Sequence, residues 1–161
     1  MRSFIWSSTA VLFGTPEFFN LGKKAGFTIL VDPTQYDIPF PQLEVITTRS
    51  YLKAQPDVVT RYMRAIVEGI YMVKQNPEPS INALRKYLKI DDREALEDVY
   101  RLYKEIYPPL PHPSPAAIQT QLTWMAERDP RAKSAKPEQF FDGSILREIE
   151  KSGFVTRLYQ K

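Results

Sequence analysis

The apolar residues beyond residue 55 recur every three or four positions, which is the period of an amphipathic helix. This spacing predicts one helix from Pro56 to about residue 75 and a second from about Ser80 to Leu88. A third is predicted after Asp91–Glu94, because an acidic cap followed three positions later by glutamate is typical of a helix N-terminus. This half of the chain is therefore predicted to be helical.

Prolines and glycines mark further helix ends. The proline-rich run 107–115 cannot be helical, so Ser114 is expected to cap, and Pro115 to open, a fourth helix with Ile118, Leu122 and Met125 facing inward. A last helix is predicted after a cap at Asp142, with Gly153 as its left-handed stop.

The first third of the chain has short apolar runs separated by turn residues. These runs predict three strands, at residues 10–13, 27–31 and 43–47. Pro16–Lys24 predicts a helix that Gly26 ends in the left-handed conformation, and Asp37–Pro41, with two prolines, predicts a stiff segment that crosses a surface or a domain boundary. Strands, then helices, predict a helix-rich α/β fold.

Size and composition fit one folded domain. The chain has 161 residues and a mass of 18.7 kDa, with 43% hydrophobic and 25% charged residues. A compact protein of this mass exposes about 8,300 Å² of the roughly 27,000 Å² that the unfolded chain exposes. The 14 prolines outnumber the 6 glycines, so we expect stiff connections.

Charge and missing residue types exclude several functions. The net charge is +3 without a basic block, which argues against a nucleic-acid partner. The chain has no cysteine, so disulfides, thiolate metal sites and cysteine nucleophiles are excluded. The single histidine, His112, is interpreted as a loop residue, and no phosphate-binding or dinucleotide-binding glycine motif is present. These residues therefore offer no catalytic, metal or cofactor motif.

The start of the chain carries a short apolar run after Met1-Arg2. Hydroxyl residues interrupt this run and no cleavage pattern follows it, so a buried strand is favoured over a signal peptide. No stretch has the eighteen or so consecutive apolar residues of a membrane span.

One turn, Gly14–Phe18, has the pattern of a binding site. A helix N-terminus that follows a strand offers free N–H groups to an anionic or polar ligand, with Thr15 as a hydrogen-bonding cap and Phe18 or Phe19 as an apolar wall. Plain helix capping without a ligand explains the same residues and is favoured on the local sequence alone.

Several short blocks occur in an order that resembles the C-terminal half of NMT1/THI5-like substrate-binding proteins, the sulfonate/nitrate/taurine type, of ABC importers. The blocks are Ala25–Asp32, Ile38–Pro41, Val45–Leu52, Gln55–Val59, Ala65–Gly69, Lys86–Leu88 and Lys151–Phe154. The resemblance covers most of the chain from about Ala10 onward and is carried by their order and spacing together.

The resemblance implies part of a type II periplasmic-binding-protein fold, in which two α/β lobes close on a small solute and deliver it to a permease. Residues 1–41 would be the tail of the second lobe and the hinge crossing, and residues 42–161 the mostly helical part of the first lobe. Thr15 and Glu17 would contact the solute, Phe18 would form a wall, and Pro39 and Pro41 would stiffen the hinge.

The same resemblance implies a small anionic or heteroaromatic solute, no catalysis, and a periplasmic or extracellular location. Family proteins are about twice as long, so the chain would be a fragment, or would complete an exposed sheet edge by pairing with another copy. Two alternatives stay open: a non-binding assembly module, and, less favoured, a thiamin-pyrimidine biosynthesis enzyme of the same superfamily.

Overall fold

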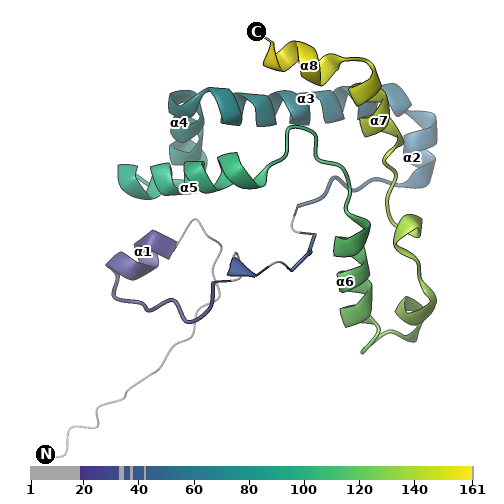
Figure 1. The fold of residues 1–161 in the computed structure, drawn as a ribbon, viewed down its shortest axis with the longest axis horizontal. Helices are drawn as coiled ribbons and strands as arrows, with labels where there is room; N and C mark the ends of the chain where they lie inside the picture. Colours follow the sequence, from purple (N-terminus) through teal and green to yellow (C-terminus); the bar gives the residue numbers. More distant parts are fainter. Residues whose placement is uncertain (1–18, 33–34, 37, 42, 161) are drawn as a thin grey trace, which may run out of the picture.

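The computed structural model describes residues 19–32, 35–36, 38–41 and 43–160, and every regular element within them is a helix (Figure 1). The helices are α1 (Phe19–Lys24), α2 (Arg49–Ala54), α3 (Pro56–Gln75), α4 (Pro77–Leu88), α5 (Arg93–Ile106), α6 (Pro115–Met125), the 3₁₀ turns η3 (Pro130–Ser134) and η4 (Pro137–Gln139), α7 (Ser144–Lys151) and α8 (Phe154–Tyr159). The predicted fold class, α/β and part of a type II periplasmic-binding-protein fold, is therefore wrong for the part of the chain that the structure describes.

The correction falls on residues 27–31 and 43–47, which were predicted to be strands. Both lie in the linking segment, residues 27–47, which joins α1 to α2. Among the described residues, no backbone group of 28–31 or 44–47 exchanges a hydrogen bond with another backbone group. A β-branched run forms a strand only when a neighbouring strand pairs with it, and no such neighbour lies within the part of the chain that the structure describes. The third predicted strand, residues 10–13, lies outside the described residues.

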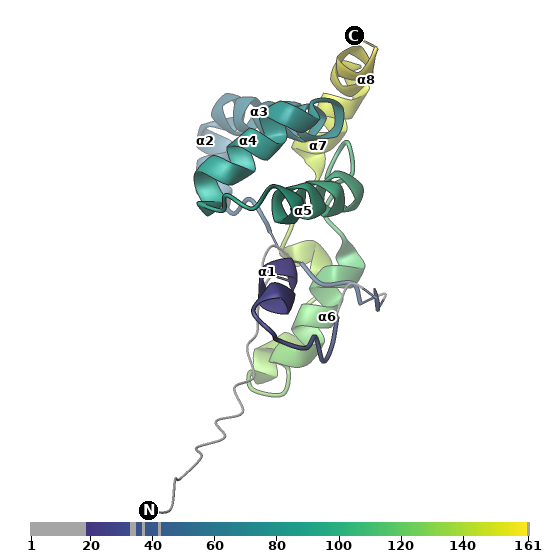
Figure 2. The same ribbon diagram turned by 90° about the vertical axis from the view of Figure 1, so that its left-hand side faces the viewer.

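Six helices form one unit, which we call the helical body: α2, α3, α4, α5, α7 and α8. The longest, α3, packs against each of the other five, and α4 also packs against α5 (Figure 1). Viewed from the side, α1 lies below α5, away from α3, and α6 extends downward from the body (Figure 2). The body is therefore organised around one central helix.

The core of the helical body is apolar and lies along one side of α5. Its members from the end of α3, α4, α5 and the turn before α5 are Val73, Ile81, Leu84, Leu88, Ile90, Ala95, Leu96 and Tyr100. Farther along α3, Val67 and Ile70 are buried, as are Leu146 and Ile149 of α7. Along α5, the apolar residues Leu96, Val99 and Tyr100 are buried, whereas Ile106 is 47% exposed at the last turn.

Local side chains cap α5 and α6 at, or one residue from, the positions that the sequence predicts. The Asp92 carboxylate accepts a hydrogen bond from the backbone N–H of Ala95 at 3.1 Å and caps α5. The Ser114 hydroxyl accepts one from the N–H of Ala117 at 3.2 Å and caps α6. The positive φ angles predicted at the two stop glycines are confirmed, at 87° for Gly26 and 68° for Gly153.

Two helix starts differ from the prediction. α4 begins at Pro77 rather than Ser80, because proline is tolerated in the first helical turn, where the missing N–H has no partner in any case. α7 begins at Ser144, after Gly143. Asp142 lies just before the helix, and its carboxylate accepts a hydrogen bond from the N–H of Ser144. The predicted helix Pro16–Lys24 is described only from Phe19 onward.

α6 packs against η3 and η4 and forms a smaller unit below the helical body (Figures 1 and 2). Its buried residues are Ala117 and Leu122, with Ala132 of η3. Met125, expected to face inward, is 48% exposed at the last residue of α6.

Many large apolar side chains of the linking segment are exposed. Phe27, Leu30, Val31, Tyr36, Ile38, Phe40, Leu43, Val45 and Ile46 are all at least 41% exposed. They make up about half of the exposed large apolar side chains among the described residues.

Candidate functional site

The predicted contact residues Thr15, Glu17 and Phe18 lie outside the described residues. The predicted hinge prolines are described: Pro39 is exposed and Pro41 is half-buried. Between them, the ring of Phe40 lies 5.1 Å from the ring of Trp124 on α6, measured between centroids. The segment that carries these prolines passes from α1 to the helical units (Figure 1).

An open depression of the surface, of about 590 Å³, lies at the N-terminal end of the linking segment, and we call it the hollow. It is lined by Lys23, Phe27, Thr28, Ile29, Leu30, Val31, Asp32, Gln35 and Tyr36. Most of these residues follow α1 directly, because Gly26 turns the chain back after the last helical turn and the N–H of Phe27 then donates to the carbonyl of Gly22 at 2.9 Å.

The hollow combines one cation, amide and carboxylate groups, and two aromatic rings. The Gln35 side-chain amide donates to Asp32 Oδ2 at 3.3 Å, which holds these two polar side chains together. Lys23 supplies a positive charge, and Phe27 and Tyr36 supply ring surface. Such a set can hold a small anion against an aromatic wall, because charged hydrogen bonds fix the ligand's orientation and rings cover its apolar part.

An ion-pair cluster connects α1 to the first turn of α5. Lys24 Nζ lies 2.6 Å from Asp92 Oδ2 and 2.9 Å from Glu94 Oε2. The pKa of Lys24 is raised mainly by its hydrogen bond to Asp92 and, to a smaller extent, by its bond to Glu94. The pKa of Asp92 is lowered mainly by the hydrogen bond from Lys24 and, to a smaller extent, by the bond from the N–H of Ala95. We call this cluster the latch.

The two pKa shifts give the latch a defined pH range. The lowered pKa of Asp92 adds stability above the ordinary carboxyl value of 3.8, and this stability is lost as the pH falls through the folded-state pKa. The raised pKa of Lys24 adds stability that is lost only as the pH rises above the ordinary value of 10.5. The latch is therefore formed throughout the neutral range.

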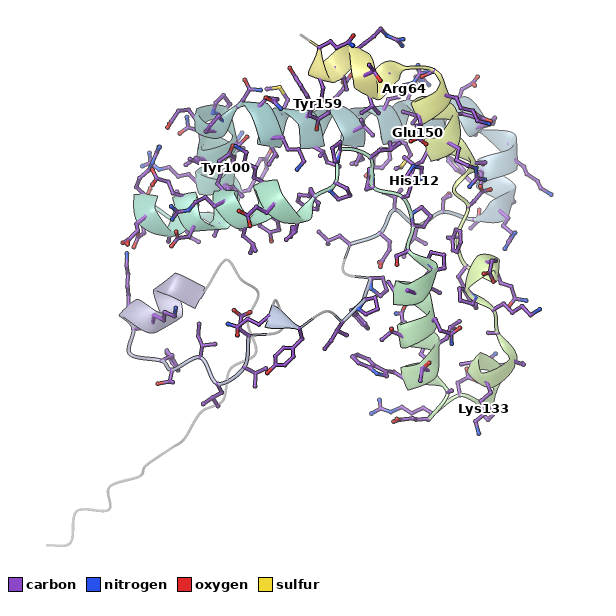
Figure 3. The ribbon with its side chains drawn as sticks, viewed as in Figure 1. Arg64, Tyr100, His112, Lys133, Glu150 and Tyr159 are labelled. Carbon is purple, nitrogen blue, oxygen red and sulfur yellow. The ribbon has the colours of Figure 1, made fainter. Side chains whose placement is uncertain are left out.

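The only histidine lies away from the hollow, beside α7. His112 Nε2 is 3.4 Å from Glu150 Oε2, and Figure 3 shows the two side chains where the proline-rich loop passes α7. No group of three or more metal-ligating side chains occurs among the described residues. In the same part of the chain, none of the helices has the length and apolar character needed to cross a bilayer.

Comparisons with protein-family models, with curated proteins and with solved structures found no match to this chain. The candidate site therefore rests on its own geometry. Sequence analysis missed Lys23, Gln35 and Tyr36, because the hollow is made by a turn and not by a motif. The signal available was a short stretch that placed two aromatic residues and an amide around Asp32-Pro33.

Proposed function

We propose that this chain is the solute-binding component of an ABC importer, or a fragment of one, and that it binds a small anionic or heteroaromatic solute by closure. The observation that carries the proposal is the placement of the hollow and the latch. The hollow lies on the α1 side of the proline-stiffened crossing, and the latch joins that side to the helical body.

Closure requires two parts that can change their relative position. α1 reaches the helical body through side-chain ion pairs of Lys24, and these are exposed charges that exchange readily with water. The covalent connection between the two parts runs through Pro39 and Pro41, whose fixed φ angles confine bending to the residues around them. The arrangement supports a motion about the linking segment.

The chemistry of the hollow supports the proposed class of solute. A sulfonate, nitrate or carboxylate group would be recognised by Lys23 and the Gln35 amide, and an aromatic or apolar remainder by Phe27 and Tyr36. Taurine, nitrate, an alkanesulfonate and benzoate are therefore the probes of choice.

Trp124 provides a direct readout of closure because its ring contacts Phe40, between the two hinge prolines. The chain has two tryptophans, so Trp6→Phe leaves Trp124 as the sole indole fluorophore. In this variant, one of the four probes is expected to give a saturable change in Trp124 emission and a rise in melting temperature.

Lys23→Gln is expected to weaken that affinity about tenfold or more, because a charged hydrogen bond to the anion is lost. The matched control is Lys133→Gln in η3, at the far end of the molecule (Figure 3), which should leave the affinity unchanged. If none of the four probes shifts either the emission or the melting temperature, the proposal is wrong.

A second candidate function is supported by the exposed apolar side chains of the linking segment. A non-binding assembly module would use these residues to associate with another polypeptide. This candidate predicts stable association together with no response to any of the four solutes, which separates it from the first.

A further inference from the structure

α1 and the residues that follow it form one structural piece, residues 19–32, which we call the arm. The N–H of Gly26 donates to the carbonyl of Lys23 at 3.0 Å, and the N–H of Phe27 donates to the carbonyl of Gly22 at 2.9 Å. These turn bonds fold the chain back on the end of α1, next to the hollow. The arm therefore carries most of the residues that line the hollow.

The arm is joined to the helical body by the ion pairs of one side chain. Among the described residues, the bonds from Lys24 to Asp92 and Glu94 are the only hydrogen bonds or ion pairs between the two. None of the close helix packings in the same part of the chain involves α1. Figure 2 shows α1 on the side of α5 that faces away from α3. Within these residues, charge rather than close helix packing therefore holds the arm in place.

The latch is accessible to water and to dissolved ions. The side chain of Lys24 is 48% exposed and that of Glu94 is 74% exposed. An exposed ion pair favours its formed state by a factor of only about 1.5–5, because two mobile side chains must be fixed and solvent screens their charges. A contact of this strength leaves the docked and released positions of the arm within a few-fold of each other in population.

The docking position on α5 keeps its structure without Lys24. Asp92 caps α5 by accepting from the N–H of Ala95, and this bond does not involve the ammonium group. Carboxylates in the first turn of a helix are stabilised by the positive end of the helix dipole, so Asp92 and Glu94 tolerate the loss of their cation. The neighbouring arginines have other carboxylates as partners, in the pairs Arg85–Asp91, Arg93–Glu78 and Arg93–Glu97. The docking position is therefore preformed, and release of the arm is reversible.

We propose that the arm docks on α5 and is released from it in solution, and that ionic strength sets the docked fraction through the latch. Salt screens this contact because the Debye length shortens from about 10 Å in 0.1 M salt to about 3 Å in 1 M salt, close to the length of the ion pair. Release of the arm carries the hollow away from α5. The docking does not require a solute, and only its effect on solute binding rests on the proposed function.

The distance between two spin labels measures the docked fraction directly. The chain has no cysteine, so Leu30→Cys in the arm and Glu105→Cys on α5 supply two exposed labelling sites. Double electron–electron resonance is expected to show a shorter, docked distance and a longer, released one. Raising the sodium chloride concentration from about 0.02 M to about 1 M should lower the ratio of docked to released molecules about two- to fivefold.

Three substitutions in this labelled protein assign the effect to Lys24. Lys24→Gln should lower the docked-to-released ratio about two- to fivefold in low salt and remove its salt dependence. Lys24→Arg keeps the charge and should keep both the ratio and its salt dependence. Lys23→Gln is the matched control, because it removes the same charge from the same helical turn but leaves the latch intact. Both lysines are exposed, so circular dichroism should show equal helix content in all variants.

Zero-length cross-linking identifies the groups in contact. A carbodiimide joins an amine to a carboxylate only where the two already touch, so Lys24 should form an amide with Asp92 or Glu94 in low salt. The yield should fall several-fold in about 1 M salt. Lys24→Arg should abolish the link, since a guanidinium group does not react. Mass spectrometry on a mixture of heavy-nitrogen-labelled and unlabelled chains distinguishes a link within one chain from a link between two.

Three results would overturn this inference. The first is a label distance that changes neither with salt nor with Lys24→Gln. The second is an equal effect of Lys23→Gln and Lys24→Gln, which would mean that total charge, and not the latch, docks the arm. The third is a cross-link that forms only between copies.

The proposed function can fail separately from this inference. A salt-dependent arm in a chain that responds to none of the four solutes would support the docking and reject the proposed function. A salt-independent arm in a chain that binds one of the solutes would support the proposed function and reject the docking.

Discussion

At the scale of single residues, the ring of Tyr100 packs in the core, but its buried hydroxyl makes no hydrogen bond to a described residue. The side chain belongs to the core between α4 and α5 and is 7% exposed. Its hydroxyl is buried and has no hydrogen-bond partner among the described residues (Figure 3). A buried polar group without a partner loses its hydration and gains nothing in return.

Tyr100→Phe is therefore expected to raise the free energy of unfolding by about 1 kcal/mol, because it removes only the unpaired hydroxyl and leaves the ring in place. Urea denaturation followed by circular dichroism measures the change. Tyr87→Phe is the control, since Tyr87 is 78% exposed and its hydroxyl is free to bond water. A loss of stability in Tyr100→Phe would contradict the expectation.

Asp92 has two separate roles, as the cap of α5 and as a member of the latch. Asparagine caps helices as well as aspartate does but carries no charge. Alanine has neither a capping oxygen nor a charge. Asp92→Asn should therefore lower the melting temperature only slightly, to the same extent as Lys24→Gln, and Asp92→Ala should lower it more. Equal effects of Asn and Ala would mean that the charge, and not the cap, is the main contribution of Asp92.

At the scale of elements, the helices were predictable from sequence because their signals are local. The cap of α5 lies three residues from the N–H that it accepts from, and the left-handed stop at Gly153 is set by its own backbone. The predicted start of α4, at about Ser80, lies one turn after its observed start, because Pro77 opens the helix.

The absence of strands at residues 27–31 and 43–47 and the position of the candidate site were not predictable, because both depend on residues far apart in the sequence. Residues 27–31 and 43–47 have β-forming sequences, but a strand depends on a partner elsewhere, and the described chain offers none. Lys23 and Gln35 both line the hollow because the chain turns at Gly26, and no spacing between these residues marks a site in advance. The predicted contacts Thr15, Glu17 and Phe18 stay predictions.

Gly69 provides a test of element stability within α3. It lies in the helix interior, is exposed, and a Cβ atom added there would meet no atom within 4 Å. Gly69→Ala should raise the free energy of unfolding by about 0.5–1 kcal/mol, because alanine loses less backbone entropy on forming a helix.

The matched change Gly153→Ala should lower the unfolding free energy, since that residue has φ 68° and its added Cβ would lie 3.1 Å from Arg157 Nη1. Thermal unfolding of the two variants beside the unmodified chain measures both effects. A destabilised Gly69→Ala would show that α3 needs glycine for a reason other than conformation.

At the scale of the whole molecule, the helical body and the smaller unit of α6, η3 and η4 differ in how much they bury. The body has most of the buried apolar side chains, whereas the smaller unit buries Ala117, Leu122 and Ala132. A unit with few buried residues opens at a lower free energy than the rest of a protein. We therefore expect the two units to unfold separately.

This expectation can be measured with Trp124, which belongs to the smaller unit. In Trp6→Phe, the Trp124 fluorescence transition in urea should have its midpoint at a lower concentration than the loss of helical circular dichroism, which reports mostly on the body. Leu96→Ala, in the core of the helical body, should lower the midpoint of the circular dichroism transition and leave the midpoint of the Trp124 fluorescence transition unchanged. Coincident transitions in the starting variant would mean that the two units unfold as one.

The central position of α3 also has a consequence for synthesis of the chain on the ribosome. α3 packs against α4 and α5, which follow it directly, and against α7 and α8, which begin only at residue 144. Roughly 70 residues separate the end of α3 from α7, and at about 5–20 residues per second their addition takes roughly 3–14 s. For that interval the face of α3 that α7 and α8 will cover is an apolar surface of a nascent chain, and a chaperone that binds such surfaces would find it there.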